Sequence, residues 1–359
     1  MRGALLALAS AAVLCVSWGA AAGHSAGTAQ ESPACSSITL VAWSPDGTQI
    51  AFSGWRLGHG PLPLRAICAA DADGKNAAPL PYTLCSKKCP LDLIEGPTRL
   101  YWVAPKLLLY GDDFRLFVIP VGGKPKLLAS GPGVSFQQFS VDASGDRVAA
   151  GSSGSCPRCA EPVTVLEVPS GKLVGRLGGS KFANIEPSIS PDGSQVVFER
   201  DYADDSGRTL GLWTAHADGS HLHHLVQTNV GGTSPLWSPA GNQIAYLEAA
   251  GNYTSALLLI PAHGGRSRTL VPHGVETVFG WSPDAHSIAF EAGGRLEVVN
   301  VASGKVRSLL QLHPGAPNVA WSPDSRQLLA NSWPRAKTCR TSLWRVPVAG
   351  GKPRLLRHC

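Results

Sequence analysis

Apolar residues recur at every second position in short runs along most of this chain, and clusters of Pro, Gly, Ser and Asp separate the runs. This pattern predicts short β-strands joined by tight turns. The stretch 40–52 shows it best: an apolar run ends at Trp43, the sequence Ser-Pro-Asp-Gly follows, and Ile50 and Phe52 then share one face of a second strand. Pro45 fixes φ at the first central position of the turn, and Gly47 can adopt the positive φ that closes it.

This strand–turn–strand stretch returns along the chain with varying erosion. Its copies centre on Trp43, Trp102, Val141, Ile189, Trp237, Trp281 and Trp321. In six copies an apolar residue follows seven positions later, at Ile50, Val148, Val196, Ile244, Ile288 and Leu328. Such self-similarity at a fixed period is the sequence signature of a repeat architecture.

A second signal has the same period. Each unit contains a later apolar run that ends in a glycine turn, and these glycines, spaced 39 to 49 residues apart, are Gly74, Gly123, Gly171, Gly219, Gly265, Gly304 and Gly351. A unit with four strands and a period of about 40–50 residues is typical of a β-propeller blade. We therefore predict an all-β fold, a seven-bladed β-propeller of four-stranded antiparallel blades. Six blades remain the alternative, because the copy at Trp102 is the most eroded.

The repeat resembles that of a known family. Trp-Ser-Pro-Asp-Gly at 43–47 followed by Ile-Ala-Phe at 50–52 looks like the WD-like β-propeller repeat of TolB, which also occurs in the propellers of prolyl-oligopeptidase-type peptidases. The resemblance covers about residues 40–356 and implies the fold without indicating a ligand. It is confined to the propeller, and we expect no TolB-type N-terminal α/β domain here.

The chain divides into three predicted parts. Residues 1–22 resemble a secretory signal peptide, with Arg2 before an apolar core and Ala20-Ala21-Ala22 as a cleavage site. Residues 23–38 form a polar leader that we expect to be disordered, and residues 39–359 form the propeller. We expect an exported protein, periplasmic or extracellular, with no membrane span, because no other apolar run is long enough.

Charge gives a candidate binding surface. The formal net charge is +6, which is modest for 359 residues and does not favour nucleic acid as a partner. In a propeller whose first strands run from top to bottom, the long connections all fall on the top face, where binding residues are commonly found. The candidate binding residues in these connections are Lys87, Lys88, Arg158, Arg335, Lys337 and Arg340.

The cysteines indicate disulfides. Without Cys15 of the signal peptide, eight remain: Cys35, Cys68, Cys85, Cys89, Cys156, Cys159, Cys339 and Cys359. An even number in an exported protein favours disulfides over a zinc site. Cys35 paired with Cys359 would staple the ring shut, and Cys339 paired with Cys359 is equally allowed; only Cys68 is expected inside a strand.

Metal binding and catalysis have weaker support. The histidines His221, His223 and His224 lack a matching carboxylate cluster, and we expect them on an exposed outer edge. The aspartates Asp201, Asp204 and Asp205 miss the spacing of a calcium loop, so we expect a solvated loop without metal. The Gly-Ser-Ser-Gly-Ser stretch at 151–155 is not a nucleophile elbow.

These observations favour a non-enzymatic, TolB-like binding scaffold that contacts a protein or glycan of the cell envelope through its top-face loops. We expect a monomer that needs no cofactor. The alternative is a metal-dependent polysaccharide lyase or hydrolase that acts in the propeller channel, as in some pectate-degrading lyases of similar shape.

Overall fold

The computed structural model describes a large part of the chain, and all of this part belongs to one compact unit, Glu31–Cys359. The described residues are 35, 38, 40–56, 64–80, 99–111, 115–130, 134–152, 161–179, 181–202, 209–228, 232–251, 254–312, 318–332 and 342–358. Within these ranges the regular elements are β-strands, and no helix there is long and apolar enough to cross a membrane. The predicted signal peptide lies outside them.

Five of the sheets contain four strands each in sequence order and antiparallel pairing. The first contains β1 (Leu40–Trp43), β2 (Gln49–Arg56), β3 (Leu64–Asp71) and β4 (Ala78–Pro79). The second contains β5 (Arg99–Ala104), β6 (Leu107–Gly111), β7 (Arg115–Pro120) and β8 (Lys126–Ser130). The third contains β9 (Val134–Val141), β10 (Arg147–Ser152), β11 (Val163–Glu167) and β12 (Leu173–Leu177). The fourth contains β13 (Phe182–Ile189), β14 (Gln195–Tyr202), β15 (Thr209–His216) and β16 (His223–Val226), and the last contains β24 (Val319–Trp321), β25 (Gln327–Ser332), β26 (Ser342–Pro347) and β27 (Arg354–His358).

The remaining sheet has seven strands because one long strand serves two units. It contains β17 (Leu236–Trp237), β18 (Gln243–Ala249), β19 (Ser255–Pro261), β20 (Arg268–Trp281), β21 (Ser287–Ala292), β22 (Arg295–Asn300) and β23 (Val306–Gln311). The first part of β20 pairs with β19 and its last part pairs with β21. Counting β20 in both halves gives units of four strands, as the sequence repeat predicts. The all-β propeller fold is confirmed, whereas the number of blades stays a prediction. Blades are numbered by the sequence repeat, so that blade four is β13–β16 and blade five begins at β17.

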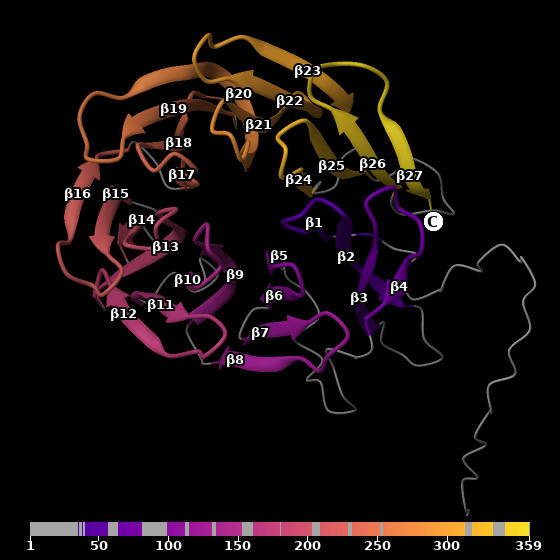
Figure 1. Cartoon of the computed structure of the whole chain (residues 1–359). Helices are drawn as coiled ribbons and strands as arrows, with labels where there is room; N and C mark the ends of the chain where they lie inside the picture. Colours follow the sequence, from indigo (N-terminus) through magenta and orange to yellow (C-terminus); the bar gives the residue numbers. More distant parts are fainter. Residues whose placement is uncertain are drawn as a thin grey trace, which may run out of the picture. The chain divides into compact units, whose positions relative to one another are not determined.

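The sheets follow one another around a ring, with the first strand of each unit on the inside (Figure 1). Neighbouring inner strands touch in the order β1, β5, β9, β13 and β17, and β20 touches β24. The ring closes where β1 contacts β24 and β25.

The Ser-Pro-Asp-Gly turns have the geometry that the sequence predicts. Gly47 has φ of 70° and its N–H donates to the Ser44 carbonyl at 2.9 Å. Asp46 accepts from the Ser44 hydroxyl at 2.6 Å and from Thr48 N–H at 3.0 Å, so this carboxylate builds the turn. Ala285 and Ser325 replace the glycine in later copies and still adopt φ of 60°, a conformation that is unfavourable for residues with a Cβ.

The core lies between adjacent sheets. The six repeated apolar residues that follow each turn, Ile50, Val148, Val196, Ile244, Ile288 and Leu328, are all 0% exposed. Each hydrophobic cluster combines strands of two neighbouring blades; Leu40 and Ile67 of blade one, for example, pack with Leu108 and Ile119 of blade two. Burial of apolar surface therefore holds each blade to the next.

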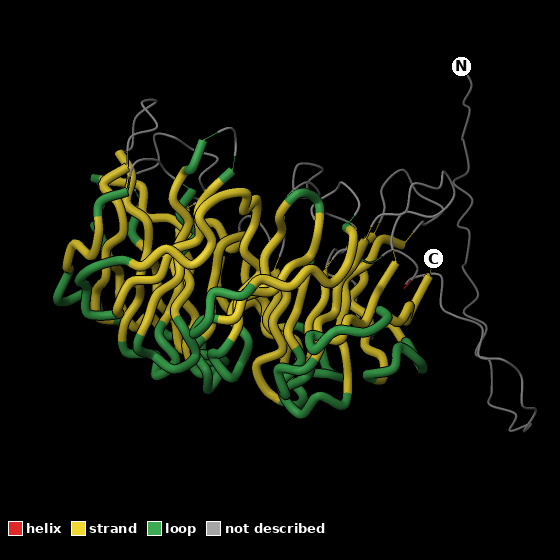
Figure 2. The backbone as a smooth tube through the Cα atoms, turned by 90° about the horizontal axis from the view of Figure 1, so that it is seen from above, coloured by secondary structure: helices red, strands yellow, loops and turns green. Residues whose placement is uncertain are grey.

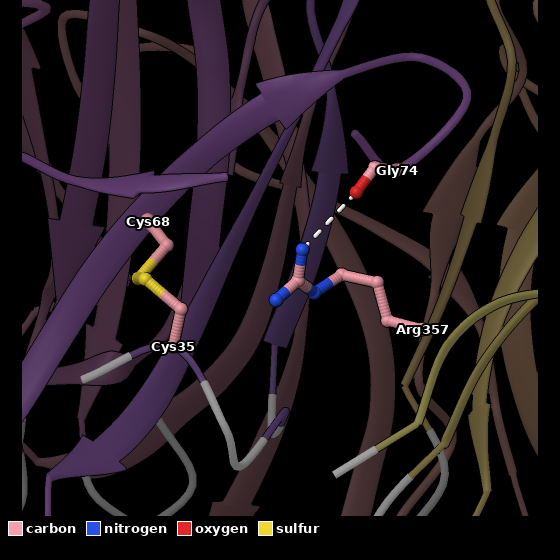
Figure 3. Close-up of a disulfide and its surroundings, with 4 residues drawn as sticks. All are labelled: Cys35, Cys68, Gly74 and Arg357. Atoms are coloured by element: carbon pink, nitrogen blue, oxygen red, sulfur yellow. Dashed lines mark hydrogen bonds between the residues drawn. A yellow bond between two sulfur atoms is a disulfide. The ribbon is translucent and has the colours of Figure 1, made fainter. Parts of the chain in front are cut away.

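At the two ends of the ring, the described strands β1–β4 and β24–β27 form separate sheets that pack against each other. Trp43 and Phe52 of blade one share a cluster with Leu329 and Leu343 of blade seven. The Arg357 guanidinium of β27 lies 5.4 Å from the Phe52 ring and donates a hydrogen bond to the Gly74 carbonyl at 3.1 Å (Figure 3).

A disulfide joins Cys35 to Cys68 in this same region (Figure 3). Cys68 lies in β3, as predicted, and both residues are buried. The alternative in which Cys35 pairs with Cys359 is therefore wrong, because Cys35 forms its disulfide with the third strand of its own blade. The other six candidate cysteines, Cys85, Cys89, Cys156, Cys159, Cys339 and Cys359, lie outside the described residues.

The two faces of the ring differ in their connections. On the bottom face, the first and second strands of most blades are joined by short turns such as 44–48, 190–194 and 322–326, and most of the described loops lie along this edge (Figure 2). The strand ends at the top face are joined by connections that differ widely in length, among them 57–63, 80–98, 153–162, 227–235 and 333–341.

Candidate functional site

The sequence-predicted binding residues Lys87, Lys88, Arg158, Arg335, Lys337 and Arg340 all lie outside the described residues. They belong to the connections 80–98, 153–162 and 333–341, which join strand ends at the top face. Their role there stays a prediction. The described residues contain a second candidate, a group of carboxyl side chains on β13 and β14 of blade four.

This carboxyl cluster consists of Glu186, Glu199 and Asp201. Glu186 lies on the inner strand β13, and Glu199 and Asp201 lie two residues apart on β14, so their side chains leave the same face of the sheet. The expectation that Asp201 lies in a loop is wrong, because β14 continues to Tyr202. Asp204 and Asp205 lie outside the described residues.

The Glu199 side chain forms hydrogen bonds with the backbone that leads into blade five. It is 0% exposed, and its Oε1 accepts from Gly232 N–H at 2.9 Å. Its Oε2 accepts from Thr233 N–H at 2.7 Å and from the Thr233 hydroxyl at 2.6 Å. One buried side chain thus satisfies three donors of the inter-blade segment, which we define as residues 232–234.

Glu186 belongs to a ladder that links consecutive inner strands. The Gln138 side-chain oxygen of blade three accepts from Glu186 N–H at 3.1 Å, and Glu186 Oε2 accepts from Ser234 N–H at 2.5 Å. The three residues are 48 positions apart in turn, as the repeat requires. Glu186 and Ser234 have φ of 51° and 43°, so both backbones adopt a left-handed conformation that costs about 1–2 kcal/mol each.

Burial controls the protonation of the cluster. Desolvation, together with the negative charges of Asp201 and Glu186, raises the pKa of Glu199 to about 8, against the hydrogen bonds from Thr233, which favour the carboxylate. Desolvation also raises the pKa of Asp201, although the Thr209 hydroxyl and Glu199 donate hydrogen bonds that lower it. Glu199 is therefore the group that holds a proton at neutral pH, and Asp201 is the acceptor beside it.

The pKa of Glu186 is also raised by burial. Hydrogen bonds from Ser234 and the positive charge of Arg99 on β5 act in the opposite direction, and the charge of Asp201 adds to the increase. The cluster thus brings three acids together, and the cation that acts on it comes from another blade.

The ring uses the position of Glu199 again at its closure. Asn331 is the fifth residue of β25, as Glu199 is the fifth residue of β14. Its Nδ2 donates to the Ile38 carbonyl at 3.1 Å, and its Oδ1 accepts from Asn318 N–H. At the junction of blades seven and one, a neutral amide at this strand position therefore bonds the chain that enters the next blade through a donor, where Glu199 uses acceptors.

Arg200 points to the opposite side of β14. Its guanidinium lies 4.3 Å from the Phe182 ring and 4.8 Å from the Trp213 ring, and its Nη2 donates to the Gly178 carbonyl of blade three at 2.6 Å. Burial lowers the pKa of Arg200, but such a group remains charged at any physiological pH. Blade four is thus bonded to both neighbours from one strand.

The candidate histidines lie at the outer edge of blade four and are exposed, as expected. His221 is not on a strand, because β16 begins at His223; it has φ of 55° in the preceding turn. Its ring stacks on His216, with centroids 4.2 Å apart. Among the residues that the structure describes, no group of three or more His, Cys, Asp or Glu side chains is arranged to hold a metal ion.

This arrangement can share a proton but gives a substrate no access to the protonated group. Glu199 is completely buried and both of its oxygens accept hydrogen bonds from the inter-blade segment. A general acid must contact the reacting atoms, directly or through one water molecule. The geometry of Glu199 therefore indicates a role in joining two blades.

Comparisons with known proteins agree with the fold. No protein-family model matches the chain. A segment of 107 residues, 29% of this chain, is 25% identical to the uncharacterized peptidase YuxL of Bacillus subtilis (strain 168), of which it spans only 16%.

Solved structures match over most of the chain. Oligogalacturonate lyase from Vibrio parahaemolyticus has a TM-score of 0.62 at 13% identity, covering 87% of this chain and 90% of the lyase. An oligogalacturonate lyase in complex with manganese has a TM-score of 0.61 at 13% identity, covering 87% and 89%. TolB from Acinetobacter baumannii has a TM-score of 0.51 at 12% identity, covering 86% and 82%. The described structure is a TolB-like β-propeller, and at these identities the likeness concerns the fold alone.

The carboxyl cluster was not predicted from the sequence. One signal was present in the sequence. Glu199 follows the apolar run Val196-Val197-Phe198, and the residues at the same position in other blades, Ser53, Leu247 and Asn331, are buried. An acid at this position is therefore unusual. Its partners on the segment 232–234 could not be identified, because that segment has no distinctive pattern.

Proposed function

We propose that this protein is an exported, non-enzymatic binding scaffold that contacts a protein or glycan of the cell envelope through its top-face connections. The observation that carries the proposal is the difference between the two faces. Four of the bottom turns repeat one Ser–Asp hydrogen bond, whereas the top-face connections differ in length from blade to blade. Variable loops on a rigid scaffold are a common means of positioning a binding surface.

The chemistry of the described residues supports a scaffold. The acids with raised pKa values in blade four accept hydrogen bonds from the next blade. Asp46, Asp192, Asp284 and Asp324 of the bottom turns are also occupied, since each accepts a hydrogen bond from the serine two positions before it. These carboxyl groups stabilise the ring.

The experiment measures partner binding with two charge-reversal variants. The first changes Lys87, Lys88 and Arg158 to Glu, in connections of the top face. The matched control changes Lys75, Lys172 and Lys305 to Glu, which are three exposed cations in bottom-face turns. Purified mature protein captures partners from an envelope fraction by crosslinking, and the affinity of the captured partner is then measured with each variant.

We expect the top-face variant to weaken binding at least about tenfold, while the bottom-face variant binds like wild type, because electrostatic attraction acts between nearby charges. Equal affinities of the two variants would contradict a top-face site. Failure to capture any partner would contradict the scaffold proposal itself.

A second candidate is a metal-dependent lyase or hydrolase that acts on a polysaccharide. It is favoured by the two oligogalacturonate lyase structures, whose TM-scores exceed that of TolB. The test incubates the protein with manganese and oligogalacturonate and follows the ultraviolet absorbance of an unsaturated product. Turnover that requires manganese would replace the scaffold proposal, and its absence with this substrate would count against the lyase.

A further inference from the structure

We propose that the carboxyl cluster Glu186–Glu199–Asp201 is a proton-operated latch that holds the inter-blade segment 232–234 against blade four and loosens it as the cluster loses its proton. The inference concerns the ring itself and is independent of what the top face binds.

The geometry makes Glu199 the centre of the latch. Three donors of the segment converge on its two oxygens at 2.6 to 2.9 Å, and Glu186 holds the following residue, Ser234, at 2.5 Å. Thr233 in turn accepts at its carbonyl from Leu247 N–H of β18 at 2.7 Å. Release of Glu199 would therefore loosen the entry into blade five and its contact with the second strand of that blade.

The charges around Glu199 make the latch sensitive to protons. Asp201 faces it from the same strand and Glu186 from the neighbouring strand β13, while Thr233 approaches Glu199 and Thr209 approaches Asp201 with uncharged donors. Arg99 acts on Glu186 from blade two, whereas the main influences that lower the pKa of Glu199 are the hydrogen bonds from Thr233. A second negative charge beside Asp201 inside the interface is therefore unfavourable, because buried like charges repel strongly.

The direction of the pH dependence follows from linkage. Glu199 has a pKa of about 8 when folded, against 4.5 ordinarily. The stability that it provides is therefore complete below its ordinary pKa and is lost as pH rises through the folded pKa. The latch should be tightest in mildly acidic solution and should weaken progressively up to about pH 8, above which the effect levels off.

The closure of the ring offers an internal control. There, the Asn331 amide donates to the Ile38 carbonyl before β1 and accepts from Asn318 N–H within its own blade, and Asn318 Oδ1 accepts from Val41 N–H of β1 at 3.3 Å. An amide does not titrate, so this junction should not follow the same pH dependence.

The experiment is amide hydrogen exchange of the mature protein across this pH range, expressed as protection factors that remove the intrinsic effect of pH. We expect the amides of Thr233, Ser234 and Leu247 to lose protection at least about tenfold between about pH 5 and pH 8. The amides of Val41 and Asn318 should change less than about twofold. Equal changes at both junctions, or none at Thr233, would overturn the proposal.

Two variants separate a proton latch from a merely structural contact. Glu199→Gln should remove most of the pH dependence at Thr233, whatever it does to the absolute protection. Asp201→Asn keeps both acceptor oxygens of Glu199 and removes one neighbouring charge, so the midpoint should move to lower pH. If both variants lower protection by a constant factor and leave the pH profile unchanged, the cluster is structural only and the proposal is wrong.

Discussion

A substitution at Gly74 tests whether the ends of the ring pack directly against each other. Gly74 lies in the turn after β3 with φ of 85°, and its carbonyl accepts the hydrogen bond from Arg357. A Cβ at this position would lie 3.0 Å from Leu356 Cβ and 3.2 Å from the Leu356 carbonyl oxygen, both on β27 of the last blade. Gly74→Ala therefore brings an added methyl group against the closing blade.

The expected magnitude has two parts. The left-handed backbone costs about 1 kcal/mol for any residue with a Cβ. Crowding against the backbone of β27 adds about 1–3 kcal/mol, the usual range for an extra carbon in a packed interface. Gly122 provides the matched control, because it occupies the corresponding turn of blade two with φ of 81° and no atom lies within 4 Å of its added Cβ.

The assay is urea denaturation of the wild type, Gly74→Ala and Gly122→Ala, with the free energy of unfolding as the readout. We expect Gly122→Ala to lose about 1 kcal/mol and Gly74→Ala to lose about 2–4 kcal/mol, since only the latter disturbs the junction of the first and last blades. Equal losses would refute the contact between Gly74 and β27, and with it the closure described above.

Three further predictions concern turns and the disulfide. Ala285→Gly should increase the free energy of unfolding by up to about 1 kcal/mol, because glycine adopts φ of 60° without a penalty. Ser325→Gly should increase the free energy of unfolding by less, because it also removes the hydroxyl that accepts a hydrogen bond from Asp284 N–H at 3.0 Å. Thermal denaturation measures both variants. The pKa of Asp192 lies below its ordinary value of 3.8, mainly because the Ser190 hydroxyl donates a hydrogen bond to it. The stability that Asp192 provides is therefore present above pH 3.8 and is lost as pH falls through the folded pKa. Asp192→Asn should reduce the acid sensitivity of unfolding below about pH 4. Cys68→Ser breaks the buried disulfide and should lower the free energy of unfolding by about 3 kcal/mol, and wild type under reducing conditions should behave alike.

The sequence predicts the fold well because the repeat carries local signals. Proline, glycine and aspartate determine each turn through backbone preference and short-range hydrogen bonds, and an apolar residue at a fixed distance determines the buried face of the next strand. The structure bears this out even at Ala285, where the turn keeps its conformation without glycine. These are interactions between residues only a few positions apart.

Long-range pairings were harder to predict. Cys35 could have paired with any of seven other cysteines, and only the placement of its segment against β3 selects Cys68. The role of Glu199 depends on residues 33 and 34 positions away in the next blade. Propensity and periodicity do not report which side chain will meet a particular backbone amide across an interface, so neither pairing could be derived from pattern alone.

The most direct test of the scaffold proposal maps where a bound partner touches the protein. The complex is crosslinked through lysines and the linked peptides are identified by mass spectrometry. We expect crosslinks at the predicted binding residues Lys87, Lys88 and Lys337, and none at Lys75, Lys172 or Lys305 of the bottom turns. Crosslinks confined to the bottom-face lysines would contradict the central claim that the varied top-face connections form the binding surface.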